Sequence, residues 1–107
     1  MTSAGARAKE LGLEFNLSMS KVSAAISAGG CEATGIPFDM NVDRLRQKDR
    51  LIRRSPWTPS LDRKDPAQGY TDKNTRVVVW LFNAAKESFT DADVMTMARA
   101  FVATDLS

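Results

Sequence analysis

The clearest hydrophobic run in this sequence covers residues 76–82, where six apolar side chains, most of them β-branched or aromatic, follow an arginine. Such a short run is typical of a strand that is buried on both faces. The segment before it predicts a shorter strand over residues 59–65 and a turn over residues 66–73 that contains Gly69. A long helix is excluded from this region by three prolines, Pro56, Pro59 and Pro66.

A first helix is predicted in the N-terminal third of the chain. Either Ser18 or Ser20 can cap its start, and it runs through Ala28. The Gly29–Gly30 pair then ends it, because glycine is the residue that most readily adopts the conformation that follows a helix. A partial apolar stripe also indicates a helix over residues 41–51.

Two more helices are predicted after the hydrophobic run. Asn83 opens a short one over residues 84–87, and Thr90 with Asp93 forms the pattern of a capping box for a second one over residues 90–104. Four apolar residues of the last helix recur at helical spacing and predict that it packs in the core: Val94, Ala98, Phe101 and Val102. The apolar residues also lie around more than one face, so a dimer contact is the alternative: Met95, Met97, Phe101 and Val102.

These elements predict an α+β protein of one domain over residues 1–107. The order strand, turn, strand, helix forms a ββα core region within residues 31–88, flanked by an N-terminal and a C-terminal helix. Residues 1–17 are weakly patterned, and we expect part of this segment to be mobile. The expected anchors of the core are five aromatic residues, Phe38, Trp57, Trp80, Phe82 and Phe101.

Charge is distributed unevenly along the chain, although the net charge is only +2. Residues 44–76 contain ten basic and four acidic residues and so carry +6, whereas the segments on either side each carry −2. A basic centre of this kind predicts a face that binds a polyanion such as nucleic acid. The alternative is a charged segment that is simply solvated.

Composition excludes several other classes of protein. No apolar run reaches the roughly 18 residues that cross a membrane, and the first residues lack the apolar stretch of a signal peptide, so we expect a cytoplasmic protein. Cys31 is the single cysteine and the chain has no histidine. An internal disulfide and a Cys/His zinc site within one chain are therefore excluded.

Two polar residues stand where a metal ion could be held. Asp62 lies near the end of the first predicted strand and Asn83 at the start of the following helix, positions that face each other in a ββα arrangement. Carboxylate and amide oxygens are hard ligands that suit Mg²⁺ or Mn²⁺, with water and a substrate phosphate completing the coordination. The alternatives are that Asn83 caps the helix and that Asp62 forms an ion pair with Arg63 or Arg76.

The same region resembles the HNH, or His-Me finger, nuclease superfamily, and within it the small phage-type and endonuclease VII-like proteins. The residues that carry the resemblance are Pro59-Ser60-Leu61-Asp62-Arg63-Lys64-Asp65-Pro66, then Gly69-Tyr70-Thr71, Asn74, Val77-Val78 and Asn83-Ala84-Ala85-Lys86. Asn74 and Asn83 are nine residues apart, as the family pattern requires. Cys31 with Thr34-Gly35 resembles the first half of the zinc knuckle that precedes this core in many members.

The resemblance implies a role for each matching residue. Asp62 and Asn83 would bind the metal, and Asn74 would brace the loop by hydrogen bonding. Arg63 stands in the place of the histidine that acts as general base. A guanidinium stays protonated at neutral pH, so Arg63 would bind a phosphate oxygen instead of activating water. The base would then be Asp65, a metal-bound hydroxide or a group on the substrate, and the alternative role of Asp65 is to cap the turn.

The function expected from the resemblance is that of a metal-dependent DNA endonuclease with a base other than histidine. Its phosphate contacts are expected from Arg53, Arg54, Lys64, Lys73, Arg76 and Lys86. One alternative is an inactive scaffold that still binds nucleic acid. Another is a phage-encoded protein that binds a host protein in the host cytoplasm.

Overall fold

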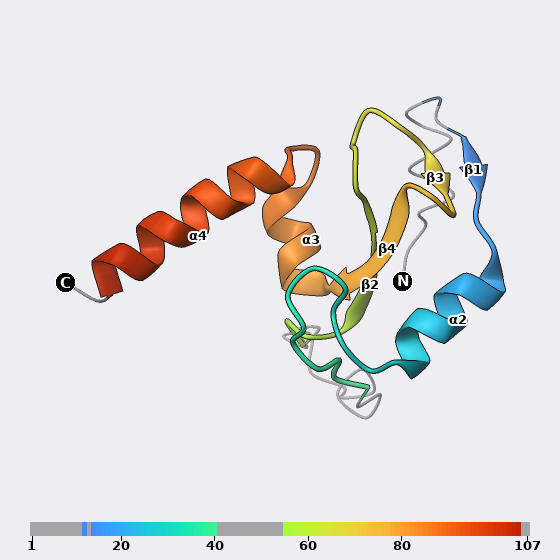
Figure 1. Ribbon diagram of the computed structural model, residues 1–107, viewed down its shortest axis with the longest axis horizontal. Coiled ribbons are helices and arrows are strands. Elements are labelled where there is room, and N and C mark those ends of the chain that lie inside the picture. The colour runs from blue at the N-terminus through green and yellow to red at the C-terminus, as the bar shows by residue number, and fades with distance from the viewer. Residues whose placement is uncertain (1–11, 13, 41–54, 106–107) are drawn as a thin grey trace, which may run out of the picture.

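The computed structural model describes residue 12 and residues 14–40 and 55–105. This part of the chain forms a small α+β protein with three helices and two two-stranded sheets (Figure 1). The α+β class predicted from the sequence is therefore confirmed. In chain order the elements are β1 (Phe15–Asn16), α2 (Met19–Ser27), β2 (Pro59–Arg63), β3 (Tyr70–Thr71), β4 (Thr75–Val79), α3 (Trp80–Lys86) and α4 (Asp91–Asp105).

The centre of the structure is the antiparallel pair of β2 and β4, whose register joins Pro59 to Val79 and Arg63 to Thr75. Pro59 is the first residue of its strand, a place where its missing N–H is tolerated. The β-branched side chains of β4 are almost completely buried, with Val78 wholly inaccessible to solvent. α3 follows β4 without a connecting residue, and the short strand β3 lies in the chain between β2 and β4.

The second sheet is a short parallel pair that ties the N-terminal segment to the loop between β2 and β4. β1 pairs with β3, with Phe15 opposite Tyr70 and Asn16 opposite Thr71. The rings of Phe15 and Tyr70 lie 5.8 Å apart between centroids. The prediction of a plain turn over residues 66–73 was incomplete, and residues 15–16 are ordered into β1. Two-residue strands carry no periodicity, and for this reason the pattern of apolar residues did not predict them.

α2 matches its prediction closely. Ser18 is the N-cap, and its side chain accepts a hydrogen bond from the backbone N–H of Lys21 at 3.3 Å. Gly29 follows the C-cap residue with a φ of 89°, a conformation that favours glycine. α2 packs against β4 through Val22, which is 5% exposed. The helix predicted over residues 41–51 lies outside the described residues.

The buried core is small and centres on Cys31, Val78 and Val79. The turn that begins at Cys31 lies along the free side of β4, where the backbone N–H of Glu32 donates to Val77 at 2.9 Å. Four partly buried apolar residues complete the core: Ala33, Ile36, Phe38 and Phe82. Among the predicted aromatic anchors, Phe38 and Phe82 are therefore correct, whereas three are wrong because they are at least one third exposed: Trp57, Trp80 and Phe101.

The predicted strand over residues 76–82 is too long, and the helix begins earlier than Asn83. β4 ends at Val79 and α3 starts at Trp80. The first N–H groups of a helix need partners from outside it. Here the N–H groups of Trp80 and Leu81 donate to the carbonyls of Thr58 and Pro56, at 2.7 and 2.9 Å. This tertiary contact allows a helix to begin within an apolar run that has no capping side chain.

The capping box of α4 is confirmed. The backbone N–H of Thr90 donates to Asp93 Oδ2 at 3.1 Å, and the N–H of Asp93 donates to Thr90 Oγ1 at 3.2 Å. The prediction that α4 packs in the core is wrong, because none of its residues is buried. α4 contacts α3 and then extends away from the rest of the molecule (Figure 1). Helical spacing predicts an apolar face but does not determine what covers it.

Replacement of Gly69 by alanine is expected to disrupt the pairing of β1 with β3. A Cβ atom at Gly69 would overlap the backbone of Glu14, so one of the two segments must move. We expect a loss of about 1–3 kcal/mol in the free energy of unfolding, the range for a forced steric overlap. Urea denaturation measures this change. Gln68→Ala, at an exposed neighbouring position, is the control and should leave stability almost unchanged. Equal stability of Gly69→Ala and the wild type would contradict the parallel pairing.

Candidate functional site

Asp62, the expected metal ligand, is buried and its carboxylate is occupied by two basic side chains. It lies directly opposite Arg76 in the β2–β4 register and is 2% exposed. Asp62 Oδ2 accepts a hydrogen bond from Arg76 Nε at 2.7 Å. From α3, Lys86 Nζ lies 3.1 Å from Oδ1 and 3.2 Å from Oδ2 of the same carboxylate. The ion pair with Arg76 that the sequence offered as an alternative is present.

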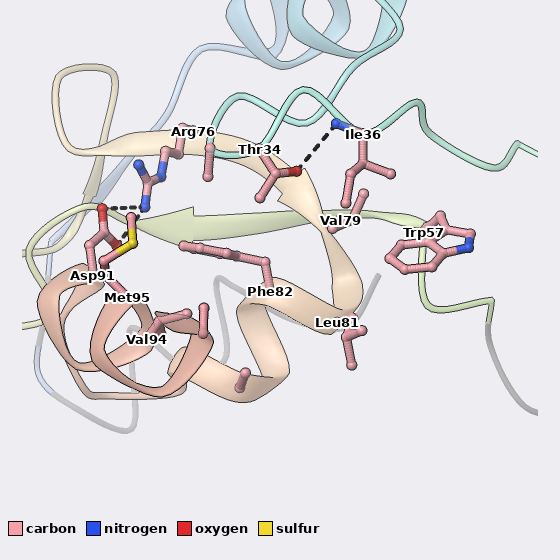
Figure 2. Close-up of a pocket in the computed structure, with 13 residues that line it drawn as sticks. Thr34, Ile36, Trp57, Arg76, Val79, Leu81, Phe82, Asp91, Val94 and Met95 are labelled. Atoms are coloured by element: carbon pink, nitrogen blue, oxygen red, sulfur yellow. Dashed lines mark hydrogen bonds and ion pairs between the residues drawn. The ribbon is translucent and has the colours of Figure 1, made fainter. Parts of the chain in front are cut away.

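A second carboxylate, that of Asp91 at the start of α4, pairs with the same two basic side chains. Arg76 Nη2 donates to both oxygens of Asp91, at 2.6 and 2.7 Å (Figure 2). Lys86 Nζ lies 3.0 Å from Asp91 Oδ1. We call these four side chains, Asp62, Arg76, Lys86 and Asp91, the Asp62 cluster. It contains two positive and two negative charges and joins β2, β4, α3 and α4.

The Lys86 ammonium is fully buried and surrounded by oxygen atoms. Besides the two carboxylates, it donates to the backbone carbonyl of Arg63 at 2.6 Å and to that of Lys64 at 3.2 Å. A buried ammonium is tolerated only when its hydrogens are satisfied in this way. Lys86 therefore anchors the end of β2 to α3.

The cluster shifts the pKa values of two of its members. Partial burial acts to raise the pKa of Asp91, but the hydrogen bonds from Arg76 and Lys86 and the two positive charges outweigh it, so the pKa lies below its ordinary value. Burial likewise acts to lower the pKa of Arg76, whereas the hydrogen bonds to Asp91 and Asp62 raise it above the ordinary value. Both shifts favour the charged forms.

These residues do not fit the Mg²⁺ or Mn²⁺ ion that we expected. A divalent cation at Asp62 would share the carboxylate with Arg76 and Lys86, each about 3 Å away, and the like charges would repel it. The amide nitrogen of Asn83 donates to Ser60 Oγ and to the carbonyl of Leu61, both at 2.8 Å, which directs Asn83 to the backbone of β2. The described residues include no group of three or more acidic, cysteine or histidine side chains that could hold a metal.

Arg63, which replaces the histidine in the resemblance, is also buried. It is 5% exposed, and its Nη1 donates to the carbonyl of Pro66 at 2.6 Å. Its guanidinium carbon lies 5.4 Å from the centre of the Tyr70 ring, in range of a cation–π contact. These contacts hold the loop after β2 and differ from the phosphate-binding role that the resemblance implied.

Asn74 and Asp65 hold the same loop by hydrogen bonds. Asn74 Oδ1 accepts from the backbone N–H of Asp65 at 2.9 Å, and Asn74 Nδ2 donates to the carbonyls of Asp65 and Gly69 at 3.1 and 2.8 Å. These are the contacts of the loop brace that the resemblance implied for Asn74. Asp65 Oδ1 accepts from the N–H of Ala67 at 2.9 Å, which is the turn-capping alternative for Asp65.

Cys31, the remaining residue of the zinc-knuckle resemblance, lies in the core and is 3% exposed. Burial acts to raise the pKa of its thiol, but hydrogen bonds from the Thr34 hydroxyl and from the backbone at Val79, Ala33 and Thr34 lower it below the ordinary value. A zinc site requires further cysteine or histidine ligands, and the chain contains no other cysteine and no histidine.

The expected nucleic-acid contacts are only partly exposed. Lys64 and Lys73 are exposed in the loop between β2 and β4, whereas Arg76 and Lys86 belong to the Asp62 cluster. Arg53 and Arg54 lie outside the described residues. The described residues contain seven basic and ten acidic side chains and so carry −3. By sequence, residues 41–54 contain six basic and two acidic residues and carry +4.

An apolar groove lies beside the cluster, and sequence reasoning did not identify it. Its volume is about 350 Å³. In Figure 2 the Arg76–Asp91 pair lies at one end of the groove and Trp57 at the other. The apolar residues that line it come from the turn after Cys31, from α3 and from α4, and include Ala33, Ile36, Leu81, Phe82, Val94, Met95 and Ala98. The signal in the sequence was the surplus of apolar residues on the last helix.

Comparisons of the chain with protein-family models, with curated proteins and with solved structures gave no match. The assignment of the site therefore depends on its own geometry. None of the described helices is both long enough and apolar enough to cross a membrane.

Removal of the Lys86 charge is expected to destabilise the fold strongly. Lys86→Met keeps most of the side-chain volume but leaves the buried Asp62 carboxylate with one partner fewer. Breaking a buried ion pair on one side costs about 3–5 kcal/mol, and we expect a loss near the lower end because Arg76 remains. Chemical denaturation gives the value. Lys64→Met, at an exposed position, is the matched control. If the two variants lost the same small amount, Lys86 would have no structural role.

Stability is also expected to fall in acid through Asp91. Its pKa is lower in the folded state than in the unfolded chain, so its contribution is complete above the unfolded value near 4 and is lost as the pH falls through the folded value. Asp91→Asn should be less stable at neutral pH and should lose less stability than the wild type between about pH 5 and pH 2. Urea midpoints measured across this range test the prediction. Parallel curves for the two proteins would contradict it.

Proposed function

We propose that this chain is a nucleic-acid-binding protein built on an HNH-like scaffold that does not cleave its target. The observation that carries the proposal is the burial and ion pairing of the Asp62 carboxylate. Its carboxylate is buried and neutralised by Arg76 and Lys86, where a metal-dependent nuclease needs a carboxylate that is free to bind a cation.

The other groups that could take part in catalysis have structural contacts of the same kind. Arg63 is buried against the loop carbonyls and remains protonated, so it cannot accept a proton from water. Asp65 caps a turn, and Asn83 bonds to the backbone of β2. The chain has no histidine to replace them as a base.

Nucleic acid is the proposed target because of the way charge is divided along the chain. The described residues carry −3, while residues 41–54, which precede β2 in the sequence, carry +4. Lys64 and Lys73 add two exposed positive charges in the loop that follows β2. Concentrated basic residues of this kind supply phosphate contacts that do not depend on base sequence.

The protein is expected not to cut DNA. Incubation of supercoiled plasmid with a high concentration of the protein, with Mg²⁺ or Mn²⁺ or without metal, should give no nicked or linear product. Agarose gel electrophoresis measures this directly. Metal-dependent nicking that disappears in Asp62→Asn would overturn the proposal and support the endonuclease hypothesis.

Binding to nucleic acid is expected without metal and with a steep dependence on salt. In fluorescence anisotropy with a labelled duplex and EDTA, the double variant Arg53→Gln/Arg54→Gln should reduce the slope of log K against log salt by about two, and so should Lys64→Gln/Lys73→Gln. Arg99→Gln, at an exposed arginine of α4 outside residues 44–76, is the control and should leave the slope unchanged. A slope of zero for the wild type would contradict nucleic-acid binding.

A further inference from the structure

The feature that the proposed function does not use is the exposed apolar side of α4. Six residues of α4 lie on one side of the helix at positions that repeat every three or four residues: Val94, Met95, Met97, Ala98, Phe101 and Val102. We call this the α4 apolar face. Phe101 is 75% exposed, and Met95, Met97 and Val102 are each more than half exposed. A contiguous patch of this kind on a small protein marks an interaction site.

The α4 apolar face contains both a projecting part and part of a groove. Val94, Met95 and Ala98 help to line the groove beside the Asp62 cluster. Phe101 lies two turns beyond Val94, about 10 Å along the helix axis at 1.5 Å per residue. The projecting Phe101 and the groove are therefore on the same face of one helix, on either side of Ala98.

We propose that this face pairs with the same face of a second copy of the chain. The two α4 helices run antiparallel about a two-fold axis near Ala98, and Phe101 of each copy enters the groove of the other. A single axis satisfies both contacts at once, because antiparallel pairing about residue 98 brings position 101 opposite position 95. A closed two-fold contact of this type leaves no further surface for chain-like growth.

The exposed apolar area on this side of the molecule reaches the lower limit for a specific interface between two copies. Six exposed apolar side chains flank the groove and the face: Trp57, Leu81, Met95, Met97, Phe101 and Val102. Their side chains are between 38% and 75% exposed. At roughly 100 Å² for each of these large apolar side chains they offer about 600 Å² per copy, which is above the lower limit of about 500 Å² per partner and below the roughly 800 Å² of a standard interface. The groove volume of about 350 Å³ also accommodates a phenylalanine side chain.

The charges around the face are compatible with this pairing. In the antiparallel arrangement, Asp105 of one copy lies opposite position 91 of the other. Asp91 is already paired with Arg76 and Lys86. Asp105 of the other copy therefore does not approach an unpaired negative charge. The charged residues Asp93 and Arg99 flank the α4 apolar face, one along each edge, because at 3.6 residues per turn each lies beside one of its methionines.

Sedimentation velocity on the full chain tests the proposal without nucleic acid. The wild type is expected at twice 11.7 kDa at micromolar concentration. Phe101→Asp places a charge in the groove of the partner and should weaken the dimer at least about 100-fold. Ala103→Asp adds the same charge in the same turn, on the opposite side of α4, and should leave the dimer intact. A monomeric wild type, or a Phe101→Asp variant that still dimerises, overturns the proposal.

Disulfide formation tests the antiparallel arrangement. Cys31 is the only native thiol and is buried, so a cysteine placed at position 98 reports on its own neighbours. Under mild oxidation, Ala98→Cys should form a covalent dimer, because the two copies meet at this residue, whereas Ala103→Cys should not. Efficient cross-linking at position 103 and none at position 98 would overturn the proposed pairing. A monomeric protein that still binds nucleic acid would contradict the proposed dimer but not the proposed nucleic-acid binding.

Discussion

The buried carboxylate of Asp62 is the constraint on which the rest of this structure depends. A carboxylate that is 2% exposed requires positive partners, because desolvation of an unpaired charge costs several kcal/mol. Arg76 supplies one partner from the neighbouring strand and Lys86 supplies the other from α3. Asp91 then balances the second positive charge and fixes the start of α4. One ionised group thus determines how the hairpin and two helices are joined.

The residues that resemble a nuclease core hold this scaffold together. Arg63 and Asn74 bind the carbonyls of the loop after β2, and Asn83 binds the backbone of β2 itself. These hydrogen bonds occupy the polar groups that catalysis would need. These contacts agree with the proposal that the scaffold binds nucleic acid without cleaving it.

The two proposals concern different parts of the molecule and reinforce each other. The proposed nucleic-acid binding depends on the basic residues 41–54 and on the loop after β2, while the proposed dimerisation depends on α4 and the groove beside it. A two-fold pairing would place two basic segments in one particle. Binding through both would raise the apparent affinity by the effective concentration of the second site, with no new contact to the nucleic acid.

By itself the sequence determined the α+β class and the elements whose signals lie within a few residues of one another. The cap at Ser18, the glycine stop at Gly29 and the Thr90–Asp93 capping box are examples, because their hydrogen bonds or backbone conformations are local. Only the tertiary structure decided where β4 gives way to α3, since the first N–H groups of that helix are satisfied by carbonyls some 20 residues earlier in the chain. It also decided that Asp62 is neutralised and that α4 is uncovered, because burial and ion pairing depend on which distant side chains the fold brings together.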